Sequence, residues 1–125
     1  MTARAVNDLR FWLSLDQLAS THAVAVDRPV GTPHPRYPDF IYPLDYGYLE
    51  GTVSGDGGGV DVWLGSIRGS SVTGVVCCVD ALKGDVELKL LLGCTHEEML
   101  LVLDIHNDGG QSAVLLVRPG EQVEI

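Results

Sequence analysis

The chain has 125 residues, of which 17 are acidic and 8 are basic, and its formal net charge at pH 7 is −9. This length favours a single domain over residues 1–125, with a core that buries about two-thirds of the unfolded surface. The negative charge repels a nucleic-acid backbone, so we expect no nucleic-acid partner. An acidic chain can still bind a phosphate compound if bound metal ions reverse the local field.

The N-terminus has two arginines but no continuous apolar core, so it does not read as a signal peptide. No apolar run approaches the ~20 residues that span a bilayer, and we expect a cytoplasmic protein without a membrane partner. The three cysteines, Cys77, Cys78 and Cys94, have no Cys-x-x-Cys spacing and no nearby histidine pair. We therefore expect buried free thiols and neither a disulfide framework nor a zinc site.

The first third of the chain gives mixed signals. Four apolar residues are spaced to line one helical face: Phe11, Trp12, Leu15 and Ala19. Ser14 and Gln17 instead form a capping-box pattern, which favours a short extended piece followed by a short helix that begins at Leu15. Residues 22–27 alternate as a half-buried strand does. Five prolines between residues 29 and 43 predict an ordered, extended loop.

Strand patterns dominate the remainder. We expect strands at residues 60–65, 71–81, 85–92 and 111–118 and a helix over residues 95–105 that begins with a Thr95–Glu98 capping box. Within residues 85–92 the pattern places Asp85, Glu87 and Lys89 on one face and directs Val86, Leu88 and Leu90 into the core. Short strands with frequent turns predict a mainly β fold: a small closed or partly open (OB-like) β-barrel with one or two peripheral α-helices.

Residues 42–62 (YPLDYGYLEGTVSGDGGGVDV) hold three tyrosines, four carboxylates and six glycines before an apolar strand. Carboxylates on a flexible, glycine-rich turn suit a hard cation such as Mg²⁺, because the chain must bend sharply to turn several oxygens inward. The glycine run could also be only a surface hairpin turn, which composition alone would favour. No phosphate-binding Walker A motif occurs in the sequence.

Around this segment the sequence resembles the family I soluble inorganic pyrophosphatases. That family carries Tyr-Pro-x-Asn-Tyr-Gly-(Tyr/Phe), a threonine, then Asp-Gly-Asp-Pro-x-Asp-Val, and later a carboxylate pair that ends in Asp-x-Lys. The matching segments here are residues 42–48 (YPLDYGY), Thr52, residues 56–62 (DGGGVDV) and residues 87–89 (ELK). Upstream, residues 27–29 (DRP) and 36–37 (RY) are similar to the family's Glu-x-Pro and Lys-Tyr. The resemblance covers about residues 22–92.

The resemblance implies a metal site with Mg²⁺ as its cofactor. Asp56, Asp61 and Glu87 would match the carboxylates that hold the metal ions, and Asp61 is best placed to touch more than one of them. Asp27 would match an acid that supports these ligands without binding the metal ion itself. The two flanking aspartates at matching spacing raise this interpretation of the glycine-rich turn above that of a plain hairpin.

The resemblance also implies a phosphate site and a pyrophosphate substrate. Arg36 and Lys89 would bind phosphate oxygens, and Tyr42 and Tyr46 would line the site. The implied catalytic residues are Asp61, Asp56, Tyr46 and Lys89. Hydrolysis of a phosphoanhydride needs cations to neutralise the oxygens and to activate water, and this chemistry agrees with the residue types.

The departures from the family pattern bear on activity. Gly58 replaces the aspartate expected to help deprotonate the attacking water, and Gly59 replaces the following proline. Leu82 stands in place of the first acid of the later pair, although Asp80 or Asp85 could lie close enough to substitute. Pro38 replaces a glutamate, a hairpin with a phosphate-binding arginine is missing, and the late tyrosine-lysine pair has no counterpart. Loss of a general base typically costs about 10²–10⁴ in rate.

Two functions remain open at this stage. The first is Mg²⁺-dependent hydrolysis of a phosphoanhydride, with inorganic pyrophosphate the foremost candidate. The second is a catalytically degenerate module that keeps the fold and binds a phosphate-bearing ligand or a protein subunit. Family members commonly assemble, so we also expect a homo-oligomer. The face formed by Asp85, Glu87 and Lys89 could equally be a solvated edge, Tyr48 is expected to pack in the core, and three histidines are expected at surface or cap positions: His34, His96 and His106.

Overall fold

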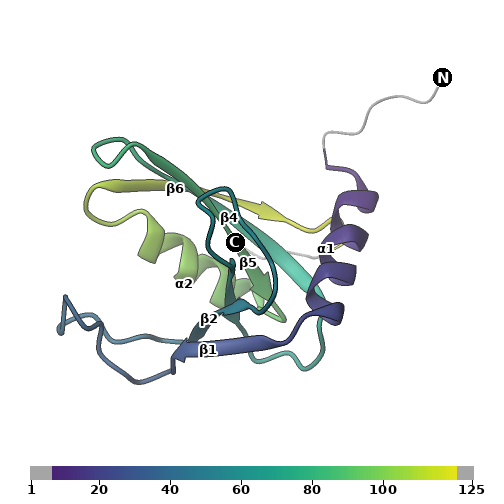
Figure 1. Ribbon diagram of the computed structural model, residues 1–125, viewed down its shortest axis with the longest axis horizontal. Coiled ribbons are helices and arrows are strands. Elements are labelled where there is room, and N and C mark those ends of the chain that lie inside the picture. Colours follow the sequence, from purple (N-terminus) through teal and green to yellow (C-terminus); the bar gives the residue numbers. More distant parts are fainter. Residues whose placement is uncertain (1–6, 121–125) are drawn as a thin grey trace.

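The computed structural model describes residues 7–120, which form two helices and six strands (Figure 1). In chain order the elements are α1 (Leu9–Thr21), β1 (Val24–Arg28), β2 (Asp45–Leu49), β3 (Val60–Leu64), β4 (Val72–Asp80), β5 (Asp85–Leu92), α2 (His96–His106) and β6 (Gln111–Val117). The strands form one sheet in the order β1-β2-β3-β5-β4-β6. None of the helices described is long and apolar enough to cross a membrane.

The sheet is antiparallel except between β3 and β5, which run parallel. Its edge strands are β1 and β6, and the sheet does not close into a barrel. The mainly β prediction is therefore confirmed in its partly open, OB-like form with two peripheral helices. The parallel β3–β5 pair places Asp61 beside Lys89, so it sets the geometry of the candidate site.

Residues of the central strands contribute alternately to two hydrophobic clusters, one on each face of the sheet. Val62, Val75 and Leu90 pack in one cluster with Trp12 and Ala19 of α1. Their sequence neighbours form the second cluster on the other face of the sheet, together with two residues of α2: Trp63, Val76, Leu91, Met99 and Val102. Because successive strand residues point to opposite faces, α1 and α2 cover opposite faces of the sheet (Figure 1).

Helix α1 begins earlier than the sequence predicts. Asp8 is its N-cap and accepts a hydrogen bond from the backbone N–H of Arg10 at 2.8 Å. Trp12 and Ala19 are seven residues apart and both lie buried on the sheet. The expected short helix from Leu15 was wrong, because the Asp8 cap and the burial of Trp12 extend the helix over residues that the sequence analysis placed in an extended piece.

Strand β2 was not expected, since the sequence analysis assigned its residues to the acidic loop. It pairs with β1 and β3 on its two sides. A Cβ at Gly47 would lie 1.9 Å from the backbone oxygen of Ala25 in β1, so only glycine permits this approach. Its glycine and the preceding Pro43 weaken any local strand signal, and pairing with both neighbours creates the strand.

Strand β5 is buried throughout its second half, and only one of its three predicted core residues lies in the core. Leu90 is fully buried, but Val86 is 73% exposed and Leu88 is 39% exposed, so the prediction that both pack in the core was wrong. The α1 cluster includes Leu90 and Leu92 but neither of these two residues. The first half of β5 therefore extends beyond the part of the sheet that α1 covers.

The second helix and two of the three cysteines agree with prediction. Thr95 and Glu98 form the predicted capping box: the Thr95 hydroxyl accepts from the backbone of Glu98, and the Glu98 carboxylate accepts from the backbone of Thr95. Cys78 and Cys94 are buried free thiols, whereas Cys77 is only half-buried. Burial raises the pKa of the Cys94 thiol to about 12, so this thiol stays protonated and unreactive at neutral pH.

Candidate active site

Lys89 is the centre of the candidate site. The residue is 5% exposed, and its ammonium group donates three hydrogen bonds. The acceptors are the Tyr46 hydroxyl at 2.9 Å, Asp61 Oδ2 at 2.9 Å and Glu87 Oε2 at 2.8 Å. An ammonium group has three donors, so the protein itself uses all of them.

These contacts fix the charge of the cluster. Burial alone would lower the pKa of Lys89, but its hydrogen bonds with Glu87, Tyr46 and Asp61 outweigh burial and raise that pKa. Burial raises the pKa of Tyr46 well above its ordinary value, although the Lys89 charge opposes the shift. At neutral pH the site therefore contains a charged lysine and a protonated phenol. Because Tyr46 accepts a bond from Lys89, its own O–H proton is available to a ligand oxygen.

Asp56 lies on the glycine-rich turn outside this hydrogen-bond cluster. Its Oδ1 accepts hydrogen bonds from the Ser54 hydroxyl and, at 2.9 Å, from the backbone N–H of Gly58. These bonds lower the pKa of the exposed Asp56 carboxyl, so it is ionised at neutral pH. Gly57, with φ of 88°, provides the left-handed residue that this tight turn requires.

The three predicted metal-binding carboxylates line one cavity of about 330 Å³. Each has one oxygen that makes no hydrogen bond to another described residue: Asp56 Oδ2, Asp61 Oδ1 and Glu87 Oε1. Lys89 neutralises only one of the three negative charges. The three residues that line this cavity therefore keep an excess of negative charge that a divalent cation could neutralise.

The residue types around the cavity agree with Mg²⁺, but their arrangement is not that of a closed metal site. Over residues 7–120, no group of three or more His, Cys, Asp or Glu side chains lies close enough together to hold a metal ion directly. Mg²⁺ usually keeps several of its waters and takes only one or two carboxylates from the protein. Asp56, Asp61 and Glu87 supply oxygen atoms of the type that Mg²⁺ prefers, but they do not form a preassembled metal-binding group.

An aromatic cluster backs the Lys89 site. Tyr42, which is buried, and Tyr46 stack with ring centroids 6.0 Å apart, and Tyr46 also contacts Trp63 at 4.6 Å. These rings hold the Tyr46 hydroxyl against Lys89. Tyr42 therefore acts on the geometry mainly through packing. Tyr48 is 38% exposed, so the expectation that it packs in the core was wrong.

His106 was expected at a surface or cap position, but it is buried. Its Nε2 accepts a hydrogen bond from Trp63 Nε1 at 3.1 Å, so the ring proton lies on Nδ1, which faces Gln111 Oε1 at 3.4 Å. Burial, assisted by the Lys89 charge, lowers the pKa of His106, which keeps the ring neutral. A spacing of seven residues from the buried Met99 was the sequence signal for this position.

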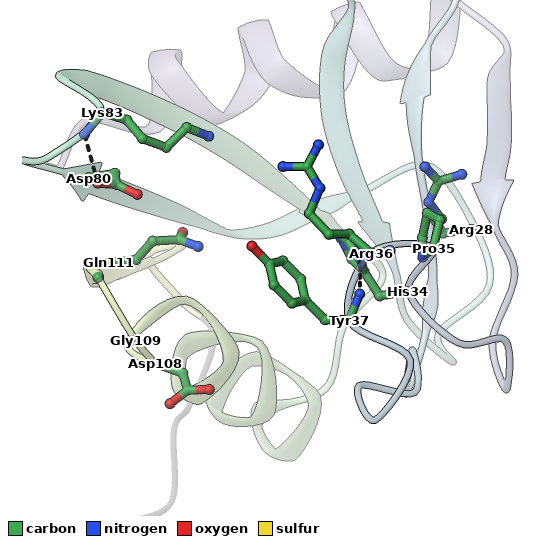
Figure 2. Close-up of a pocket in the computed structure, with 11 residues that line it drawn as sticks. Arg28, His34, Pro35, Arg36, Tyr37, Asp80, Lys83, Asp108, Gly109 and Gln111 are labelled. Carbon is green, nitrogen blue, oxygen red and sulfur yellow. Dashed lines mark hydrogen bonds between the residues drawn. The ribbon is translucent and has the colours of Figure 1, made fainter.

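The remaining predicted residues lie outside the carboxylate cavity. Arg36 lines a separate cavity of about 1010 Å³ together with Arg28 and Lys83 (Figure 2). Asp27 lines a third cavity, of about 910 Å³, whose wall includes Tyr42 and Tyr46. The structure thus brings Asp61, Glu87, Lys89 and Tyr46 together, with Asp56 at the rim, and places Arg36 and Asp27 in adjoining cavities.

The fold is that of the inorganic pyrophosphatases. An inorganic pyrophosphatase from Neisseria gonorrhoeae matches with a TM-score of 0.57 at 19% sequence identity, over 75% of this chain and 80% of that chain. The inorganic pyrophosphatase from Helicobacter pylori matches with a TM-score of 0.50 at 13% identity, over 76% of this chain and 80% of that chain. The resemblance predicted from the motifs is confirmed at the level of the fold.

No protein-family model matches the sequence, and no curated protein matches it significantly. At identities below 20%, the structural likeness describes the chain as a divergent protein with a pyrophosphatase-like fold. Activity has to be argued from the residues of the site.

Proposed function

We propose that this chain hydrolyses a phosphoanhydride with the help of Mg²⁺, and that inorganic pyrophosphate is its first candidate substrate. The observation that carries the proposal is that Asp56, Asp61 and Glu87 line one cavity, each with an oxygen free of hydrogen bonds to described residues, and that Asp61 and Glu87 bind the buried Lys89. A hard cation and a phosphate are the complementary ligands of such a site.

Mg²⁺, when bound, would supply the charge that neutralises phosphate oxygens and activates water. The protein's own part is an exchange of partners at Lys89. All three of its donors are in use, so a phosphate oxygen can bind Lys89 only after Asp61 or Glu87 gives up its hydrogen bond. Neutralising those carboxylates frees the ammonium group, which predicts that cation and phosphate bind cooperatively.

Tyr46 would orient the phosphate. Its phenol is protonated and held by Lys89, and its O–H can donate to a phosphate oxygen without carrying charge. No carboxylate stands at Gly58, so the chain has no group there to take the proton of the attacking water. We therefore expect a rate lower by the typical cost of a missing general base, about 10²–10⁴.

The second candidate function is a non-catalytic binding module. The absence of a carboxylate at Gly58 favours this function. So do the three hydrogen bonds of Lys89, because a lysine whose donors are all used within the protein can have a purely structural role. Gly58→Asp separates the two functions. The added Cβ would lie 3.3 Å from Asp56 Oδ1 on a backbone without a positive φ, so a small shift of that side chain accommodates it. A large gain in turnover from near nothing marks a degenerate enzyme.

The decisive experiment measures phosphate release from pyrophosphate with and without Mg²⁺. Asp61→Asn removes one charge at the cavity and should abolish metal-dependent release. Glu50→Gln is the matched control, because Glu50 is an exposed carboxylate that does not line the carboxylate cavity. Release that is absent in the folded natural chain, or equal in both variants, refutes the hydrolysis proposal. Sedimentation velocity of the same samples tests the proposed homo-oligomer.

A further inference from the structure

The few basic residues of this acidic chain are unevenly placed. Residues 7–120 contain seven, of which three form salt bridges: Arg10, Lys89 and Arg118. The other four form no salt bridge within these residues: Arg28, Arg36, Arg68 and Lys83. Three of those four line a single cavity of about 1010 Å³. A chain of net charge −9 thus gathers most of its unpaired described cations around one hollow.

The three cations come from separate elements. Arg28 ends β1, Arg36 lies in the proline-rich loop, and Lys83 lies in the turn between β4 and β5. Figure 2 shows the Lys83 and Arg36 side chains extending from opposite sides of the cavity, with Tyr37 between the loop and Gln111. Carboxylates of Asp80 and Asp108 also line the cavity, so the cations outnumber the acids by three to two.

Hydrogen bonds fix the backbone at two of these three cations. Backbone N–H groups of Arg36 and Tyr37 both donate to His34 Nδ1, at 3.0 and 3.1 Å. The backbone N–H of Lys83 donates to Asp80 Oδ1 at 3.0 Å. Because both attachment points are ordered, an anion that binds here does not have to order the loop and the turn.

The aromatic cavity of about 910 Å³ continues from the basic one. The two cavities share five lining residues: Arg28, His34, Tyr37, Asp108 and Gln111. Phe40, Tyr42, Tyr46 and Trp63 contribute the rest of the aromatic wall. At the junction, Tyr37 is 62% exposed and its ring lies 5.1 Å from that of His34. A planar ligand ring can stack on such an exposed phenol.

We propose that the joined basic and aromatic cavities bind a nucleoside phosphate. The phosphates would lie among Arg28, Arg36 and Lys83, the base would stack on Tyr37, and the ribose hydroxyls would donate to the Asp108 carboxylate. Inorganic pyrophosphate would leave the aromatic wall uncovered, and a nucleoside would leave the cations unpaired. This proposal concerns binding and stands whether or not the chain hydrolyses a phosphoanhydride.

The test is isothermal titration calorimetry with ADP at about 150 mM salt in EDTA, where no Mg²⁺ takes part. Adenosine and inorganic pyrophosphate are the comparison ligands. We expect ADP to bind at least about tenfold more tightly than either, since only ADP uses both the cations and the stacking surface. A lack of ADP binding, or pyrophosphate binding as tight as that of ADP, overturns the proposal.

Variants separate the two halves of the site. Lys83→Ala should weaken ADP and pyrophosphate alike, by about tenfold. Tyr37→Leu should weaken ADP by about fivefold or more and leave pyrophosphate unchanged. Arg68→Ala is the matched control, since this cation also lacks a salt bridge but lines neither cavity. If Arg68→Ala weakens ADP binding as much as Lys83→Ala does, the effect comes from the overall charge and not from the cavity. If Tyr37→Leu does not weaken ADP binding, the claim that the base stacks on Tyr37 is refuted.

The outcome does not depend on the hydrolysis proposal. Calorimetry in EDTA reads the basic and aromatic cavities, whereas Mg²⁺-dependent phosphate release reads the carboxylate cavity. If Asp61→Asn abolishes release but leaves ADP affinity intact, the two proposals succeed separately. If ADP fails to bind while release persists, only the nucleotide proposal falls.

Discussion

Replacing Lys89 with methionine tests the central claim about the site. The change keeps an unbranched apolar side chain that is one atom shorter, and it removes the one cation that Asp61 and Glu87 share. Breaking a buried ion pair by removing one partner costs about 3–5 kcal/mol. Here the side chains of Asp61 and Glu87 remain 29% and 30% exposed, so water offsets part of the loss and we expect about 2–3 kcal/mol.

A loss of this size lowers the melting temperature of a chain of this length by roughly 10 °C. Urea unfolding at neutral pH measures the free energy directly. Lys89→Met combined with Asp61→Asn and Glu87→Gln should recover most of the loss, because replacing every charge of the cluster leaves none uncompensated. This triple variant is the control for packing defects caused by methionine.

Mg²⁺ provides the second readout of the same variant. With Lys89 removed, a bound cation becomes the remaining source of positive charge for Asp61 and Glu87. Added MgCl₂, compared with KCl at equal ionic strength, should therefore stabilise Lys89→Met by at least about 1 kcal/mol more than it stabilises the natural chain. A destabilisation below about 0.5 kcal/mol, or an equal effect of Mg²⁺ on both proteins, would refute the claim that the lysine and the metal compete for these carboxylates.

Three further changes test other parts of the structure. Gly47→Ala should cost about 3 kcal/mol or prevent folding, because its Cβ would overlap the Ala25 carbonyl oxygen, and circular dichroism with urea unfolding measures this. Thr95→Ala should cost about 1 kcal/mol in urea unfolding, through loss of the helix cap, whereas Thr95→Ser should cost little. The pKa of His106 is lowered on folding, so the unfolded chain binds the proton more readily. Stability from the neutral ring is full above the ordinary pKa of 6.5 and is lost as the pH falls through the lowered folded pKa; a flat stability between pH 5 and 7.5 would contradict this.

The parts of the fold that could be predicted carry strong local signals. The strands around residues 60–64, 72–80 and 111–117 are short apolar runs that contain several valines, and the Thr95–Glu98 box marks the start of α2. The missed parts depend on contacts between distant segments. Gly47 weakens the local strand signal of β2, and only the pairing with β1 and β3 makes that segment a strand. The first helix begins at its Asp8 cap, which the competing Ser14 pattern obscured.

The site shows the same division. The motif spacing predicted that Asp61, Glu87 and Lys89 belong together, and the parallel β3–β5 register brings them together. That all three lysine donors are satisfied within the protein could not be read from the sequence, because it depends on the side-chain geometry across three strands. The grouping of Arg28 with Lys83 was missed for a similar reason, since these residues are 55 positions apart and meet only through the fold.

The distribution of positive charge connects the two proposals. Lys89 is buried and already hydrogen-bonded to the Asp61 and Glu87 carboxylates, so an incoming phosphate cannot readily contact it first. Arg36 and Lys83 are exposed and form no salt bridge among residues 7–120, so a phosphate meets them at a lower desolvation cost. Tyr46 belongs to both regions, since it lines the aromatic cavity and accepts a bond from Lys89. Because the basic and aromatic cavities share lining residues, Tyr46 connects the region proposed for the nucleoside phosphate to Lys89 through one hydrogen bond.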